Sequence, residues 1–243
     1  DGSEGAVLLQ NNLTVNGNLN VKSGKLMFDG ASSLTLLVNR NVSVQADGHI
    51  GVTTASAFHN MIVKGDFRNY GTVKFSNVAQ YEPATNGAVR LTFEGASNND
   101  FIINGSTQLY RLFINKGEND FYTLSVTSNN IDHFKLMGPY EGSTGLEISE
   151  SGLEGWERLP LVIRKGTLKL GSNIKIDRLG YNREGGDWDA IKEFHIPSGA
   201  ALWVNGAELQ TASESDFVYG AYANSGLSLE GRLRMSAGTF VTP

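Results

Sequence analysis

The 243-residue sequence contains no cysteine, only five prolines and no long apolar run. The lack of cysteine excludes thiol catalysis, Cys-ligated zinc and a disulfide framework. A membrane-spanning helix needs roughly 18 consecutive apolar residues. The longest apolar runs here, such as residues 34–38, have only the length of a strand. We therefore expect no membrane span.

Charged residues are also scarce, at 19%, and acids outnumber bases by 25 to 20, which gives a net charge of −5. This balance argues against nucleic acid or an anionic membrane as the main partner. In contrast, 29 glycines and 22 asparagines supply about a fifth of the chain. Both residue types are poor in helices and favoured in turns. The composition therefore predicts an all-β protein, and the hydrophobic content of 40% argues against disorder.

Short alternating strands, each closed by a turn pair, repeat along the chain; residues 13–15 before Asn16-Gly17 are one example. Equivalent positions recur after 21, 23 and 24 residues, from Leu13 to Leu34, from Leu19 to Val42 and from Leu26 to Ile50. A period in the low twenties with three strands is what one coil of a parallel β-helix requires. We predict a right-handed parallel β-helix of about nine to eleven coils, roughly 45 to 50 Å long, as a single domain over residues 1–243.

Three stretches interrupt the repeat and are expected to project from the stack as loops: residues 77–88, 138–158 and 181–190. A 3.6-residue period is absent. Only residues 7–9 and 191–194 would allow a short helical turn.

Four sequence segments carry a resemblance to a known class of proteins: residues 112–117, 165–171, 196–203 and 229–240. They resemble the β-solenoid stretches of very large secreted surface proteins of Bacteroidota, including gliding-motility adhesins. The resemblance is strongest from about Val89 onward. It implies export to the bacterial cell surface, attachment through other parts of the protein, and neighbouring solenoid segments of the same chain as partners. It offers no catalytic residues to transfer.

The leading hypothesis is therefore a structural and adhesive segment of a large exported surface protein. The last strand-like run, residues 227–241, has repeat character and no polar cap, so we expect the native chain to continue.

Catalytic motifs are missing. The sequence has no Gly-x-Ser-x-Gly and no phosphate-binding loop, and its four histidines, which have no metal spacing, are expected at the surface or at corners. Glycoside hydrolysis needs two carboxyl groups about 5 to 9.5 Å apart. The candidate pairs are Asp187 with Asp189 and Glu154 with Glu157, but both lie in expected loops. A polysaccharide lyase or hydrolase is thus the less favoured alternative, and no catalytic residue is assigned.

Aromatic residues in the loops suggest a second alternative, a carbohydrate-binding module on residues 181–190. Trp188, Tyr181 and Trp156 could stack on sugar rings of a surface polysaccharide, or could cover an open side of the solenoid. Trp203 alternates with Leu202 in a strand and could face the core or a groove.

Calcium is the only cofactor that the sequence suggests. Glu184, Asp187 and Asp189 could ligate it together with loop carbonyls, but solvated loop acids are the favoured interpretation.

Overall fold

The structure, a computed structural model, describes residues 5–53, 57–77, 87–138, 157, 159–176, 194–211 and 227–241. Strands dominate these residues, and all hydrogen-bonded pairings between the named strands are parallel. The short 3-10 helix η1 (Ile131–His133) interrupts the strands, and the structure describes no α-helix in these ranges. The all-β class and the parallel pairing are therefore confirmed. The segment from Ala6 to Leu9, which allowed a helical turn, is a strand.

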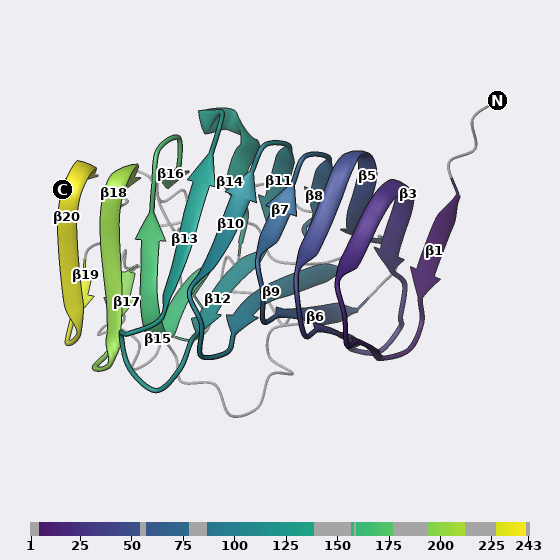
Figure 1. The fold of residues 1–243 in the computed structure, drawn as a ribbon, viewed down its shortest axis with the longest axis horizontal. Coiled ribbons are helices and arrows are strands. Elements are labelled where there is room, and N and C mark those ends of the chain that lie inside the picture. The colour runs from purple at the N-terminus through teal and green to yellow at the C-terminus, as the bar shows by residue number, and fades with distance from the viewer. Residues whose placement is uncertain are drawn as a thin grey trace, which may run out of the picture.

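The strands form three parallel ladders that advance along the long axis of the molecule, from β1 near the N-terminus to β20 near the C-terminus (Figure 1). The first ladder consists of β2 (Leu13–Val15), β4 (Thr35–Val38), β6 (Phe58–Val63), β9 (Ala88–Glu94), β12 (Arg111–Asn115) and the first half of β15 (Leu161–Leu170). Two further strands pair with each other, β17 (Phe194–Ile196) and β19 (Leu227–Leu229).

The second ladder contains the first halves of the long strands β3 (Leu19–Phe28), β5 (Val42–Val52), β18 (Ala200–Gln210) and β20 (Arg232–Val241), with β7 (Phe67–Asn69), β10 (Asn99–Ile103), β13 (Thr123–Ser128) and the second half of β15 between them. The third ladder contains β1 (Ala6–Leu9), β8 (Thr72–Lys74), β11 (Ser106–Leu109), β14 (Phe134–Leu136), β16 (Lys175–Ile176) and the second halves of the same four long strands.

The pairing register tests the repeat period read from the sequence. Leu19 pairs with Val42 and Leu26 with Ile50, so two of the three predicted offsets are confirmed. The third is wrong by two residues, because Leu13 pairs with Leu36 and not with Leu34. A shift of two residues leaves every side chain on the same face. Alternation alone therefore could not choose between these two registers.

Inward side chains of successive strands stack into one continuous core. In the second ladder, the paired positions Val42, Phe67, Phe101 and Val126 are all buried. The Phe101 ring lies 5.1 Å from that of Phe67 and 5.4 Å from that of Phe93 on the first ladder. Each such side chain stabilises the fold by about 1.5–3 kcal/mol through burial of apolar surface.

Glycines with a left-handed backbone occupy the corners inside the long strands. Gly24 in β3 has φ 73°, and a Cβ built on it would lie 2.5 Å from the carbonyl oxygen of Gly5. Gly166 in β15 has φ 91°, and its Cβ would lie 2.8 Å from that of Lys116. Any side chain at these corners would strain the backbone and also displace the neighbouring strand.

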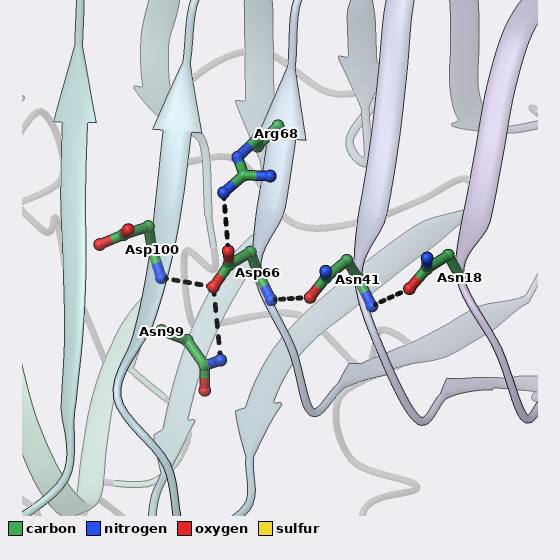
Figure 2. A network of polar contacts seen from close by, with 6 residues as sticks. All are labelled: Asn18, Asn41, Asp66, Arg68, Asn99 and Asp100. Atoms are coloured by element: carbon green, nitrogen blue, oxygen red, sulfur yellow. Dashed lines mark hydrogen bonds and ion pairs between the residues drawn. The ribbon is translucent and has the colours of Figure 1, made fainter.

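Polar side chains form a row of hydrogen bonds at one corner, just before β3, β5 and β7 and at the start of β10; we call it the corner ladder (Figure 2). Asn18 Oδ1 accepts from the Asn41 amide at 3.1 Å, and Asn41 Oδ1 accepts from the Asp66 amide at 2.9 Å. Asp66 Oδ1 then accepts from the Asp100 amide at 3.1 Å, while its other oxygen pairs with Arg68 at 2.9 Å. Each side chain thus satisfies a backbone donor of the next strand that the sheet itself leaves unpaired.

A buried lysine lies beneath the corner ladder. The Lys116 side chain is fully buried, and its Nζ donates to Asn99 Oδ1 at 2.6 Å. Burial lowers the pKa of Lys116 to about 8, and the negative charge of Asp66 opposes this shift. The corner therefore keeps a cation inside the molecule by surrounding it with amide and carboxylate oxygens.

We predict that Phe101→Ala lowers the free energy of unfolding by about 3–5 kcal/mol, because it leaves a cavity between the rings of Phe67 and Phe93. The matched control is Phe121→Ala, since Phe121 is 79% exposed; the expected loss there is below about 0.5 kcal/mol. Urea denaturation followed by circular dichroism measures both. Equal losses for the two variants would contradict the assignment of Phe101 to the core.

We also predict that Asn41→Ala costs about 1 kcal/mol of unfolding free energy, because the Asp66 amide loses its acceptor. Asn16→Ala is the matched control, since Asn16 Oδ1 accepts only from the exposed side chain of Asn39. We expect less than half of the Asn41 effect there. A larger loss for Asn16→Ala in the same denaturation assay would refute the role given to the corner ladder.

Candidate functional site

The candidate site is a pocket of about 450 Å³ on the outer surface of the second ladder, near its C-terminal end. This volume lies within the range of about 300–1,000 Å³ that is typical of small-molecule sites. The pocket is lined by a turn that precedes β13 and by outward side chains of β13, β15 and β20: Asn119, Asp120, Phe121, Thr123, Thr167, Arg232 and Arg234.

The strand register brings these distant residues together. Thr123 pairs with Thr167, Thr167 with Ala201, and Ala201 with Arg232, so they form one column across four strands. Leu168 and Leu202, which follow two of these positions, are fully buried. Because side chains alternate along a strand, the column faces outward.

Three contacts hold the turn that forms one wall of the pocket. The Phe121 amide donates to Asn119 Oδ1 at 3.0 Å, and Thr167 Oγ1 donates to the Asp120 carbonyl oxygen at 2.7 Å. The Asp120 carboxylate accepts from Arg232 at 2.7 Å. Arg232 reaches it from β20 because Ala201, which lies between Arg232 and Thr167 in the register, has only a methyl group. The turn therefore presents the exposed Phe121 ring from a fixed backbone.

A second outward column lies next to the first and contains Ser125, Lys169, Trp203 and Arg234 in register. Lys169 Nζ lies 4.2 Å from the centre of the Trp203 ring, a cation–π contact. Trp203 Nε1 donates to Ser236 Oγ at 2.9 Å. Trp203 therefore faces outward, which resolves the choice between core and groove.

The charge around the pocket differs from that of the whole chain. Three cations, Lys169, Arg232 and Arg234, lie within the two columns, against the single carboxylate of Asp120. Asp120 is engaged by Arg232, whereas Arg234 has no ion-pair partner within the described ranges. The arrangement offers a guanidinium, hydroxyl groups and an aromatic ring to a ligand. Its one acid is held in an ion pair with Arg232.

Beside the turn, Lys165 Nζ pairs with Glu118 at 2.6 Å. The hydrogen bond and positive charge of Lys165 lower the pKa of the exposed Glu118 carboxyl. The two charges of this pair cancel each other, so the positive charge at the pocket comes from the arginines.

The site residues proposed from the sequence are not the residues that line this pocket. The candidate sugar-stacking residues Trp188, Tyr181 and Trp156 fall outside the described residues, as do the candidate calcium ligands Glu184, Asp187 and Asp189. The three expected loops also fall largely outside them. These hypotheses keep the status of predictions.

Glu157 is the one member of the proposed carboxylate pairs that the structure describes. Its side chain is buried and forms an ion pair with Arg164, and its carbonyl oxygen accepts from the buried Arg111. Arg164 also lies over the Phe113 ring, 5.1 Å from its centre. These contacts give Glu157 a structural role beneath the protein surface. Its proposed partner Glu154 lies outside the described residues.

One histidine differs from expectation. His59 is fully buried, whereas the sequence suggested histidines at the surface or at corners. Its ring stacks on Phe28 with centroids 5.3 Å apart, and its Nδ1 accepts from the Leu34 amide at 3.0 Å. Burial lowers the pKa of His59 to about 4, with Asp29 opposing the shift. No cluster of three or more His, Asp or Glu side chains suited to a metal ion occurs among the described residues.

The pocket residues could not be found from the sequence. Asn119, Asp120 and Phe121 read as a short turn, and the only signal there is an aromatic residue after two turn-forming residues. Arg232 and Arg234 lie more than a hundred residues further along the chain. Their position beside the turn depends on the register of four strands, which alternation does not determine.

Comparisons of the chain with protein-family models, with curated proteins and with solved structures found no match. In the part of the chain that the structure describes, no helix has the length and apolar character needed to cross a membrane.

The buried His59 predicts a pH dependence of stability. Its folded-state pKa of about 4 lies below the unfolded value of 6.5, so the unfolded chain binds the proton first as the pH falls. The stability contribution is complete above pH 6.5 and is lost between pH 6.5 and 4, by about 3 kcal/mol.

In His59→Asn, which keeps an acceptor for the Leu34 amide, this part of the pH dependence should disappear. Denaturation midpoints at pH 4 to 7 measure it, with His133→Asn as the control, because His133 lies at the surface beside Asn129. An unchanged slope in His59→Asn would show that other groups cause the acid sensitivity.

Proposed function

We propose that this chain is a structural and adhesive β-solenoid segment of a large exported cell-surface protein. The observation that carries the proposal is the continuity of the ladders. The second ladder runs from β3 to β20, across almost the whole described chain. Such stacking makes a rod whose length grows with each strand added.

The proposed rod is a right-handed parallel β-helix in which the three ladders are the three faces of each coil. Parallel crossovers in one sheet are right-handed in about 98% of cases. The sequence predicts about nine to eleven coils. The third ladder contributes nine strand segments among the described residues, from β1, β3, β5, β8, β11, β14, β16, β18 and β20.

The exposed edge of β20 supports a neighbouring solenoid segment as partner. β20 pairs with β18 on one side and with no other strand of the described ranges. Met235 on this strand is 52% exposed, although it continues a column in which Val204 and Leu170 are fully buried. An edge of this kind is a template for another parallel strand. We propose that the next coil of a longer solenoid covers it.

Placement on a bacterial cell surface rests on the resemblance to secreted Bacteroidota adhesins. The parallel ladders agree with that resemblance, since the resembling proteins are expected to be solenoids. An adhesive role further needs a lateral surface that remains open when coils stack above and below. The pocket beside Phe121 lies on such a lateral surface, because its residues point outward from the strands.

The decisive test is the size and location of the native protein. Peptide mapping and intact mass should place this sequence in a polypeptide far heavier than 26.3 kDa. Protease treatment of intact cells should release peptides from it before any cytoplasmic marker. A mature native chain of about that mass, protected inside intact cells, would overturn the proposal.

A further inference from the structure

We propose that the pocket beside Phe121 binds an acidic polysaccharide whose sugars carry carboxylate groups. All residues that line this pocket belong to this chain. It holds whether or not the chain belongs to a larger surface protein, so the two proposals can fail separately. It also places glycan binding on different residues from the 181–190 loop that the sequence suggested.

The first step is the free cation. Arg232 already pairs with Asp120 at 2.7 Å, but Arg234 lines the same pocket with no ion-pair partner among the described residues. A guanidinium offers two parallel donors that match a carboxylate. Lys169 lies in the same column as Arg234, on the other side of Trp203, and adds a second positive charge to this surface. The ligand that this surface favours is therefore an anion.

The second step is the aromatic ring. Phe121 is 79% exposed, although a large apolar side chain normally stabilises a protein by being buried. The Asn119, Thr167 and Arg232 contacts fix the turn that carries it, so little order has to be gained on binding. An exposed ring on a fixed backbone suits the flat apolar face of a sugar.

The third step is the polar lining. Thr123 and Asn119 place a hydroxyl and an amide group on the pocket wall, where they can exchange hydrogen bonds with sugar hydroxyls. The second outward column lies about 7 Å from the first, since two residues along a strand span about that distance, and its Arg234 lines the pocket. A chain of linked sugars is long enough to contact the columns on several strands at once. A small free anion would contact only one position.

Nucleic acid fits this surface less well. The chain has a net charge of −5, and Glu118 and Asp120 lie beside the cations. Phosphate backbones are bound by surfaces that carry many lysine and arginine side chains without ion-pair partners. Here Arg232, which lines the pocket with Arg234, is already paired with Asp120. We therefore treat single-stranded DNA as a competitor in the test.

The test uses the 243-residue chain and oligomers of polygalacturonate, measured by isothermal titration calorimetry. We expect binding that Phe121→Ala and Arg234→Ala each weaken by about tenfold or more. Arg234→Lys keeps the charge but loses the paired donors, so it should give an intermediate loss. Neutral dextran should bind at least tenfold more weakly than polygalacturonate.

Matched controls lie on other surfaces. Tyr70→Ala removes an exposed aromatic ring, and Lys135→Ala removes an exposed cation on β14. Neither should change the affinity. All variants should unfold at the temperature of the unaltered chain, which separates loss of binding from loss of fold.

Three results would overturn the inference. One is the absence of polygalacturonate binding. Another is an equal loss of affinity in Lys135→Ala and Arg234→Ala, which would indicate unspecific charge attraction. The third is tighter binding of oligo-dT or dextran sulfate than of polygalacturonate, with Phe121→Ala leaving that affinity unchanged. Each outcome leaves the proposal of a longer surface protein untouched.

Discussion

Each strand pairs one-to-one and in parallel with the next strand of its ladder, and this pairing limits every other feature of the structure. The backbone groups on a strand edge must find their partners on a strand that lies about 4.8 Å away. The side chain at an inward position must therefore pack against the side chains at the paired positions of the adjacent strands, as Phe67 and Phe101 do. Insertions are tolerated only between strands. The spacing of paired residues grows accordingly, from 23 between Leu19 and Val42 to 34 between Asn69 and Ile103.

The corners between ladders supply hydrogen-bond acceptors for backbone amides that the strands leave unpaired. Where the chain leaves one ladder for the next, its amides point away from the sheet and need other acceptors. Asn18, Asn41 and Asp66 supply them one after another along the ladder, and each accepts from a backbone amide at the next strand. The corner also requires close approach of the backbone: a Cβ on Gly65 would lie 2.4 Å from Asn41 Oδ1. The high content of glycine and asparagine thus reflects two distinct needs of the same turn.

Much of this architecture could be predicted from the sequence, because it depends on local signals. Alternation located the strands, turn pairs located the corners, and the offsets from Leu19 and Leu26 gave the register. The offset from Leu13 was wrong because Leu34 and Leu36 are equivalent by alternation. The burial of His59 was also missed, since it depends on contact with Phe28 of β3, which lies about thirty residues earlier in the chain. The pocket could not be predicted at all. Arg232 meets Asp120 only after several strands between them have been placed, and a shift in any one of those registers would separate the pair.

The direction of the hydrogen bonds has a mechanical consequence. Since strands lie across the long axis, the bonds between paired strands run along it (Figure 1). A pull on the two ends would therefore load the outermost strand alone, one bond after another, whereas a sideways load would be shared by all three ladders. Under tension the stack of strands would lengthen in steps, each releasing the residues between one strand and its ladder neighbour, about 23 to 25 in the N-terminal half. Such a stack would yield to a sudden pull by peeling at its end and would shorten again when the strands pair again.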